Sequence, residues 1–391
     1  MNPEDGAQLG LDGLARQLYR IASGEAPAES FPIRLVQDPA TVRAILADHS
    51  AFPKNYDFLS VFADGRFTAN DPDWTRRAKL TQPAYARAMG GLDADAVADI
   101  YRRHLTGRAG PAGDELHRAF IEAALAVVSH VLGLKKAIAW NEAWLVQARR
   151  MLALRQWIGF VGARAADMER LDARLAVLRE EILGLWRGEP ELQALLEDMA
   201  RRGGDIPDFD AGEELIQNII ASSETTASSL MWAVHVLAGR PDLATRLRKG
   251  DLEPETFIAE LLRLFPPVPF VTRESRYACL IGSESFAESE PLAISFVGLH
   301  CDHRHWARPL EFDPERPEWT SSAPSPAGYF PFSTGARVCG GMKIARAELK
   351  AGLQVLVSAF DIQGGPNSMA LNYGLSLRPI TGAALVARRG S

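Results

Sequence analysis

The chain has 391 residues, ordinary apolar content (47%) and a formal net charge of −6. These values allow one large domain or two with a sizeable core, and the negative charge argues against general nucleic-acid binding. Three cysteines are too few for a disulfide scaffold and fit a reducing compartment. Residues 1–20 hold no long apolar run, so we expect no signal peptide or membrane anchor, and a soluble cytoplasmic protein.

The first hundred residues predict short helices, one strand and an apolar loop. A helix is expected over residues 40–52, followed after Tyr56 by a mixed apolar, Gly-containing loop over 58–67. Asp71-Pro72 is a helix-start signal, which predicts a helix that carries Trp74.

Residues 93–205 are dense in Ala, Leu, Arg and Glu with helical periodicity. Residues 140–164 and 168–186 are predicted to form long amphipathic helices. This stretch contains no catalytic constellation and no internal repeat.

A single long helix is predicted over residues 210–239. Asp210 suits the N-cap position, and Gly239-Arg240-Pro241 is a stop signal. About 29 residues span roughly 44 Å, enough to cross a domain. The polar run 222–226 is costly in a buried helix unless these groups work or are paired. We expect the Thr225 hydroxyl to return to the carbonyl of Ala221 and open a notch.

Glu260 and Arg263 share one face of a helix predicted over 254–265. Alone, such a pair is also typical of a solvated surface. Proline residues end this helix, and residues 268–273, which include Val268, Phe270 and Arg273, then predict a strand.

The run His300-Cys301-Asp302-His303-Arg304-His305 admits two interpretations. Cysteine and histidine at this spacing can bind zinc. A solvated turn is the interpretation we favour, because a four-ligand site would have to be arranged within one short loop.

Cys339 sits in a glycine-rich loop just before a helix predicted over 342–360. Free N–H groups and the positive dipole end at a helix N-terminus lower a thiol pKa. Gly335 and Gly341 let the backbone approach a flat, bulky group, and Arg337 supplies a positive charge. This combination suits a thiolate ligand to haem iron, with the arginine on a propionate. The alternative is a buried free cysteine beside a glycine turn.

The spacing Phe332-x-x-Gly335-x-Arg337-x-Cys339-x-Gly341 resembles the haem-binding loop of the cytochrome P-450 family. The resemblance covers roughly residues 40–390. It implies a mainly α fold with small β-sheets, formed by one domain over 1–391 whose haem-binding core spans about 208–365. Haem b would be clamped between the long helix and the Cys339 loop.

The same resemblance assigns roles to individual residues. Cys339 would be the iron ligand, and Glu224 and Thr225 the catalytic proton relay. Glu260, Arg263 and Arg316 would form a structural network. The remaining haem contacts would be Arg337, Arg273, Trp74, Phe332, Gly335, Gly341 and Ala221. Substrate would meet Val268, Phe270, Ser222 and Tyr56.

Three positions depart from the family pattern: Ala78, Ser222, and Cys301, which stands where the family has an arginine in a turn. Ala78 stands where the family has a propionate-binding arginine, and the nearby Arg76 and Lys79 are expected on a solvated face instead. Ser222 stands where the family has glycine, which predicts a smaller and more polar pocket.

The resemblance implies a monooxygenase that inserts one atom of O2 into an apolar organic substrate. Electrons would come from a ferredoxin or flavodoxin with its NAD(P)H-dependent reductase. We expect the partner to dock on a basic patch of Lys343, Arg346 and Lys350, joined by Arg76, Arg77 and Lys79. The alternatives are a haem-thiolate enzyme that acts as a peroxygenase or catalyses a rearrangement, and a noncatalytic haem protein.

Overall fold

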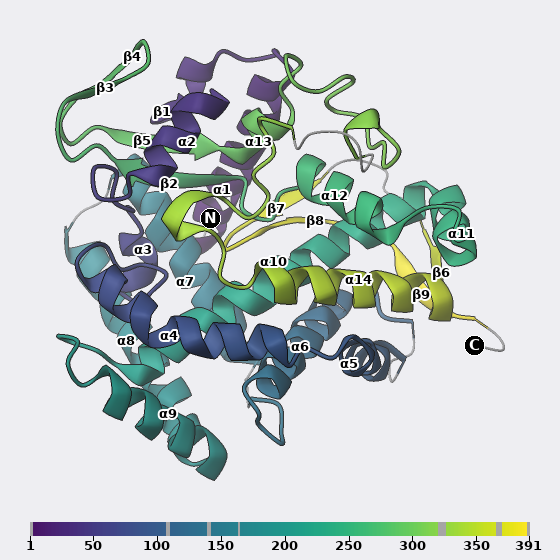
Figure 1. Cartoon of the computed structure of the whole chain (residues 1–391), viewed down its shortest axis with the longest axis horizontal. Helices are drawn as coiled ribbons and strands as arrows, with labels where there is room; N and C mark the ends of the chain where they lie inside the picture. Colours follow the sequence, from purple (N-terminus) through teal and green to yellow (C-terminus); the bar gives the residue numbers. More distant parts are fainter. Residues whose placement is uncertain are drawn as a thin grey trace.

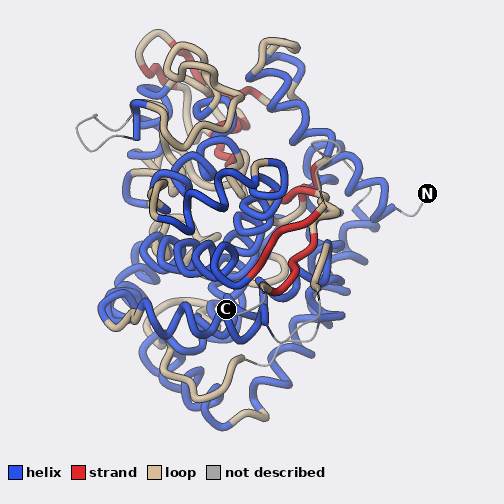
Figure 2. Tube along the Cα trace, turned by 90° about the vertical axis from the view of Figure 1, so that its right-hand side faces the viewer, coloured by secondary structure: helices blue, strands red, loops and turns tan. Residues whose placement is uncertain are grey.

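The computed structural model describes residues 3–106, 110–138, 142–162, 165–319, 326–364 and 370–388. Within these ranges the chain is mainly helical with small sheets (Figures 1 and 2), which confirms the predicted fold class. The helices are α1 (Pro3–Ala22), α2 (Pro39–Ala47), α3 (Asp57–Ser60), α4 (Asp73–Gly90), α5 (Ala94–Thr106), α6 (Gly113–Val131), α7 (Glu142–Val161), α8 (Ala165–Arg187), α9 (Pro190–Gly203), α10 (Ala211–Gly239), α11 (Pro241–Lys249), α12 (Pro254–Leu264), α13 (Phe296–His300) and α14 (Met342–Ala359).

The strands form several small sheets beside the helices, and β7 and β8 run near the centre of the view (Figure 1). The largest has the order β1-β5-β2, with β1 parallel and β2 antiparallel to β5. The hairpin β3-β4 and the pairs β6-β9 and β7-β8 are two-stranded. The strands are β1 (Arg34–Val36), β2 (Phe270–Glu274), β3 (Cys279–Ile281), β4 (Glu284–Phe286), β5 (Pro291–Ser295), β6 (Phe360–Gln363), β7 (Leu371–Tyr373), β8 (Leu377–Pro379) and β9 (Ala384–Ala387).

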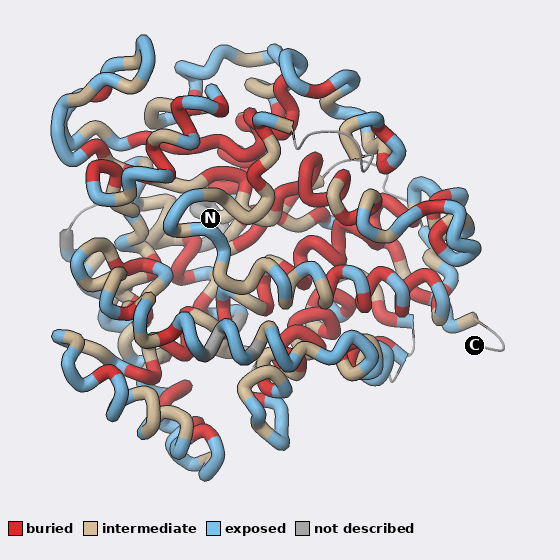
Figure 3. The backbone as a smooth tube through the Cα atoms, viewed as in Figure 1, coloured by how far each residue is buried: buried red, intermediate tan, exposed pale blue. Residues whose placement is uncertain are grey.

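Helix α10 crosses the centre of the molecule beside α14 (Figure 1). Its N-cap is the predicted one, because the Asp210 carboxylate accepts the N–H of Glu213 at 2.9 Å. Of its 29 residues, 22 are buried, and the central helix is mostly in the buried colour in Figure 3. Apolar burial on this scale supplies most of the driving force that holds α10 in place.

The first third of α10 holds the loop over residues 63–68. Three side chains of the helix accept backbone N–H groups of the loop: Glu213 from Asp64 (2.6 Å), Glu214 from Arg66 (2.8 Å) and Gln217 from Phe67 (3.1 Å). The Gln217 amide also donates to the Ala63 carbonyl at 2.7 Å. This loop is therefore fixed by α10, although about 150 residues separate them in sequence.

Several observed boundaries differ from the predicted ones. Helix α2 ends at Ala47, five residues before the predicted end at residue 52, and the short helix α3 enters the predicted loop over 58–67. Helix α7 lies within the predicted stretch 140–164, of which residues 140, 141, 163 and 164 are outside the described part, and α8 extends slightly beyond 168–186 at both ends. Strand β2 begins at Phe270 rather than at Val268, and Phe360 opens β6 instead of closing α14.

A buried carboxylate ties α12 to the segment that follows α13. Glu260 accepts hydrogen bonds from Arg263 (2.8 Å to each oxygen) and from Arg316 (2.9 and 3.0 Å). The Asp313 N–H (2.9 Å) and the Trp319 indole (3.1 Å) also donate to it. All three charged groups are at most 2% exposed. The two arginines also donate to backbone carbonyls, so this network braces the whole segment.

Glu260→Gln should strongly destabilise the protein. The change leaves two buried guanidinium groups without their shared charge, which costs about 3–5 kcal/mol. Urea unfolding followed by circular dichroism should show a clearly lower midpoint. The control is Glu315→Ala, which breaks an exposed ion pair with Arg246 and should leave the midpoint unchanged. Equal midpoints for the two variants would contradict the role given to the network.

Candidate active site

The Cys339 loop is a tight turn that leads into α14. Its Cys339 N–H donates to the Phe332 carbonyl at 3.0 Å, which closes the loop, and a short turn of 3-10 helix covers Gly335–Arg337. Gly335 has a φ of +75°, and a Cβ there would lie 2.5 Å from the Leu46 carbonyl oxygen. The glycine is therefore required by the close packing of the loop against α2. Cys339 itself is exposed.

The pKa of the Cys339 thiol differs in direction from the prediction. We expected the helix N-terminus to lower it. Desolvation by the surrounding protein instead raises this pKa, while the N–H of Gly341 and the charge of Lys54 lower it only in part. The predicted N–H interaction therefore exists, but it is smaller than the cost of desolvating a thiolate.

The middle turn of α10 is the open part of an otherwise buried helix. Ala221 is exposed, and Ser222 and Thr225 are half-buried. The Thr225 hydroxyl donates to the Ala221 carbonyl at 2.9 Å, which is the expected hydrogen bond. The Ser222 hydroxyl turns back to the Ile219 carbonyl at 3.1 Å. This turn therefore presents small side chains whose hydroxyls are already engaged.

Three cations converge beside the Cys339 loop: Lys54, Arg273 and Arg337. Lys54 donates to the Phe67 carbonyl at 2.6 Å. Arg337 donates to the carbonyls of Phe67 (3.4 Å) and Ala69 (2.8 Å). Arg273 is 3% exposed and lies opposite Lys54 in an isolated β-bridge. The fixed loop over 63–68 thus supplies carbonyls that position two of the three charges.

The three cations destabilise one another. Burial, Arg337 and Arg273 hold the pKa of Lys54 well below its usual range. Burial and Arg273 lower the pKa of Arg337 to about 10, and burial also lowers that of Arg273. Within the described residues, no carboxylate forms an ion pair with any of them. An uncompensated buried cluster of one sign is a site suited to an anionic group.

Trp74 lies next to this cluster, on α4. The Arg337 guanidinium carbon is 4.7 Å from the centroid of its ring, and His49 packs on it edge to face. Ala78 is half-buried on the same helix, and Arg76 and Lys79 are exposed, as expected for a solvated face. The third cation beside Arg273 and Arg337 is therefore Lys54, and α4 contributes none.

Arg77 was predicted to join an exposed basic patch, and this prediction is wrong. Its side chain is 1% exposed and forms ion pairs with Asp73 (2.6 Å), Asp64 (3.1 Å) and Glu214 (3.4 Å). Its position on α4 directs it toward α10 and the loop over 63–68 rather than toward solvent.

Glu224 is 3% exposed and belongs to a polar compartment away from the open turn. Its carboxylate pairs with Arg149 of α7 and accepts a hydrogen bond from Ser376 at 3.4 Å. His117 of α6 faces it at 3.9 Å. Neighbouring residues of a helix point about 100° apart, so Glu224 and Thr225 serve different sides of α10.

The four predicted substrate contacts have different surroundings. Ser222 lies on the open turn of α10. The Tyr56 ring stacks on Phe67 with centroids 5.4 Å apart, and its hydroxyl bonds Arg273. Phe270 is 3% exposed, and Val268 is partly buried. Phe270 packs in an aromatic cluster with Phe31, Phe160 and Tyr373.

A zinc site is not found around His300. The described residues contain no cluster of three or more His, Cys, Asp or Glu arranged to hold a metal. Instead, His300 is fully buried, faces the Arg263 carbonyl and accepts the Phe330 N–H at 2.9 Å. Burial and the charge of Arg263 lower its pKa to about 3, so it remains neutral.

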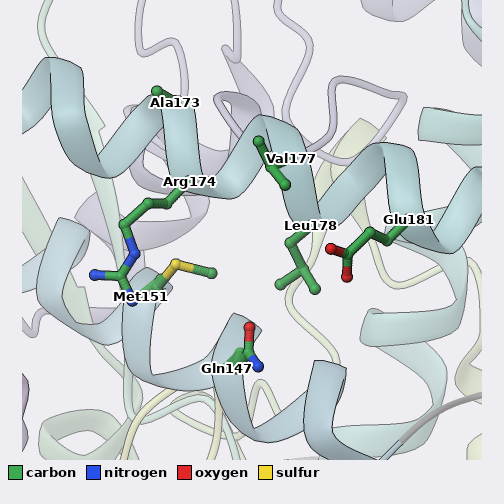
Figure 4. Close-up of a pocket in the computed structure, with 7 residues that line it drawn as sticks. All are labelled: Gln147, Met151, Ala173, Arg174, Val177, Leu178 and Glu181. Carbon is green, nitrogen blue, oxygen red and sulfur yellow. The ribbon is translucent and has the colours of Figure 1, made fainter.

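A hollow of about 310 Å³ lies between α7 and α8 (Figure 4). Arg174 and Glu181 carry its charged groups, and Figure 4 shows these side chains on α8 above Gln147 and Met151 of α7. Neither α10 nor the Cys339 loop contributes to it, so it is separate from the open turn and the cation cluster.

Several residues of the site escaped the sequence analysis: Lys54, Arg149 and His117. Each acts across elements that are far apart in the chain, and no local spacing marks them. The one available signal was the position of Lys54 beside Tyr56, in front of the apolar loop.

Comparisons with known proteins find relatives of one kind. The model of the family described as Cytochrome P450 matches residues 255–381, which include Glu260, Arg273 and the Cys339 loop. The chain is 23% identical to cytochrome P450 CYP72A616 of Paris polyphylla over 90% of its own length and 79% of that relative. It is 31% identical to cytochrome P450 4A24 of Sus scrofa, but over only 45% of this chain and 38% of that one.

The fold is also similar to that of CYP175A1 from a Thermus species, with a TM-score of 0.71. The match covers 91% of this chain and 89% of that structure at 23% identity. No helix among the described residues has both the length and the apolarity to cross a bilayer. The family model over residues 255–381, the relatives and the similarity in fold all point to one group, the cytochrome P450s.

Proposed function

We propose that this protein is a monooxygenase that inserts one oxygen atom from O2 into a C–H or C=C bond of an apolar organic molecule. The observation that carries the proposal is Cys339 beside three cations, the buried Arg273 and the half-buried Lys54 and Arg337, which form no ion pair with a carboxylate among the described residues. A thiolate ligand and an anionic, flat cofactor account for both features. When bound, haem supplies oxygen activation, which a thiolate ligand favours.

The residues around Cys339 fit haem b. Cys339 would ligate the iron, and Arg337, Arg273 and Lys54 would neutralise the two propionates. These anions would offset burial and the repulsion that together lower the pKa values of Lys54 and Arg337. Trp74 would contribute from α4, and Phe332, Gly335 and Gly341 would shape the loop. Ala221 would border the cofactor from α10, where its small side chain leaves room.

Thr225 and Glu224 would manage protons on the two sides of α10. The Thr225 hydroxyl donates to the Ala221 carbonyl, so its oxygen remains free to accept a hydrogen bond at the open turn. Glu224 would hold a proton in the buried compartment and release it toward Thr225. This separation keeps a charged carboxylate away from an apolar substrate.

The substrate would bind against Ser222, Val268, Phe270 and Tyr56. Apolar and aromatic side chains dominate this set. The hydroxyl of Ser222 is already paired with the Ile219 carbonyl. A small to medium apolar molecule matches such a surface.

Electrons would arrive from a ferredoxin or flavodoxin and its NAD(P)H-dependent reductase, in the cytoplasm. Lys343 and Arg346 are exposed on α14, just beyond the Cys339 loop. Lys350 pairs with Glu255, so it adds little net charge. The remaining patch is small, and an acidic partner would gain mainly in association rate.

The iron ligand is tested by the carbon monoxide adduct of the reduced protein. We expect an absorbance typical of haem-thiolate proteins in the wild type and its loss in Cys339→Ser. A wild-type adduct that absorbs like a histidine-ligated globin would refute the proposal. Assays with NAD(P)H, ferredoxin and reductase, compared with hydrogen peroxide alone, then separate monooxygenase from peroxygenase activity.

Lys54→Met should weaken haem binding without weakening the haem-free fold. Loss of a charged hydrogen bond of about 1.5–3 kcal/mol predicts haem transfer to apomyoglobin that is faster by roughly tenfold or more. The melting temperature of the haem-free protein should stay level or rise, because one of three repelling charges is gone. Lys79→Met, an exposed lysine of α4, is the control. Unchanged haem transfer in Lys54→Met would show that Lys54 does not hold a propionate.

Charge reversal of Lys343 and Arg346 to Glu should slow reduction by an acidic ferredoxin at low salt. Electrostatic steering accounts for roughly 10- to 1,000-fold in association rate, and the effect should shrink as salt rises. Stopped-flow reduction measures it, and substrate affinity should not change. The matched control reverses Lys135 and Lys136, which are exposed on the α6–α7 connection. Equal slowing in both double variants would show that net charge, not this patch, matters.

A further inference from the structure

The polar compartment around Glu224, behind α10, contains ionisable groups that have no role in the proposed function. Glu224 and Ser228 lie one turn apart and both reach Ser376, whose hydroxyl is 2.6 Å from that of Ser228. Arg149 enters from α7, and His117 enters from α6. Figure 1 shows α6 running below α10, and the two helices pack along one another.

His117 is buried, but one of its ring nitrogens has no hydrogen-bond partner. The residue is 2% exposed, and its Nε2 atom has no hydrogen-bond partner. Buried polar side-chain atoms without a partner are rare, and each one asks for an explanation. The nearest acceptor is Oε2 of Glu224, 3.9 Å away. A normal hydrogen bond needs about 2.9 Å, so the two atoms would have to approach by about 1 Å to form one.

A surface ion pair lies close to this compartment along α6. Asp114 lies one turn before His117 on α6, and its side chain is 83% exposed. It pairs at 3.0 Å with Arg378 of β8. The charged groups that face His117 are therefore Glu224 from α10, Arg149 from α7, and Arg378 with Asp114 on the solvent side.

We propose that His117 is a positioning residue that relays protons from the solvent side of α6 to the carboxylate of Glu224. The proposal rests on the proposed function, in which Glu224 supplies protons at the open turn of α10. It gives the enzyme a proton path through the protein that does not cross the substrate site.

The relay step balances without any redox partner. The Nε2–H bond of neutral His117 breaks as an O–H bond forms at Oε2 of Glu224, while Nδ1 takes a proton from a hydronium ion, which leaves as water. The ring ends neutral, with its proton on Nδ1, and reorientation restores the starting tautomer. Burial and the charges of Arg149 and Arg378 hold the pKa of His117 well below its usual value. A neutral ring that accepts and donates in one step avoids the disfavoured imidazolium.

The test follows the protonation of Glu224 in the ferric holoenzyme, without turnover. An acid jump monitored by infrared spectroscopy should reveal a carboxylic acid band that Glu224→Gln removes. His117→Gln keeps a polar group but cannot relay, so growth of this band should slow by at least about tenfold, since positioned proton transfer contributes 100-fold or more. The control is His235→Gln, another buried histidine with an unpartnered ring nitrogen, on α10 beside Trp232.

Band growth at the wild-type rate in His117→Gln would overturn the relay. If that variant loses its haem, His117→Asn provides the same comparison. In turnover, His117→Gln should consume more NAD(P)H per product than wild type, with normal substrate affinity. Absence of wild-type product would refute the monooxygenase proposal, whereas the infrared rates would still decide the relay.

Discussion

Helix α10 buries many polar groups, and the arrangement of the site depends on where the partners of Glu213, Glu214, Gln217 and Glu224 lie. Its first turns take up the backbone of the loop over 63–68 through Glu213, Glu214 and Gln217. Its middle turn engages the Thr225 hydroxyl internally and sends Glu224 behind the helix. Unpaired, these groups would each cost a few kcal/mol, comparable with the net stability of a domain. Function and folding therefore use the same contacts.

The loop over 63–68 transmits this constraint to the cofactor side. Its Phe67 carbonyl accepts hydrogen bonds from both Lys54 and Arg337. The backbone that α10 holds in place therefore also positions two cations. Charges of one sign in a poorly solvated place repel, and the protein tolerates them because carbonyl dipoles hold each one. The negative charge of an anionic ligand would attract all three cations, and this attraction would contribute to the free energy of binding. The site is thus prepared for a dianionic group before the group arrives.

Local sequence patterns predicted the long helix and the Cys339 loop, but they did not predict contacts between residues that are distant in the chain. Asp210 and Gly239 mark the limits of α10 because capping depends on neighbouring residues alone, and the glycines around Cys339 reveal a loop that needs close backbone approach. By contrast, Lys54 and His117 gain their roles from elements that meet only in the folded chain. The pKa direction at Cys339 was wrong for the same reason. Desolvation depends on three-dimensional packing, which a helix-terminus argument ignores.

The polar middle of α10 also fixes how the helix is turned about its own axis. A slip by one residue, about 100°, would exchange adjacent side chains. The carboxylate of Glu224 would then face the open turn of the helix, and Arg149 would be left opposite a hydroxyl. A helix that packs only through leucine and valine tolerates small slips at low cost, because one methyl group replaces another. Here a rotation of the helix by one residue would leave a buried charge without its partner. Helix α10 therefore has one stable orientation about its axis, and its hydroxyl side and its carboxylate side cannot be exchanged.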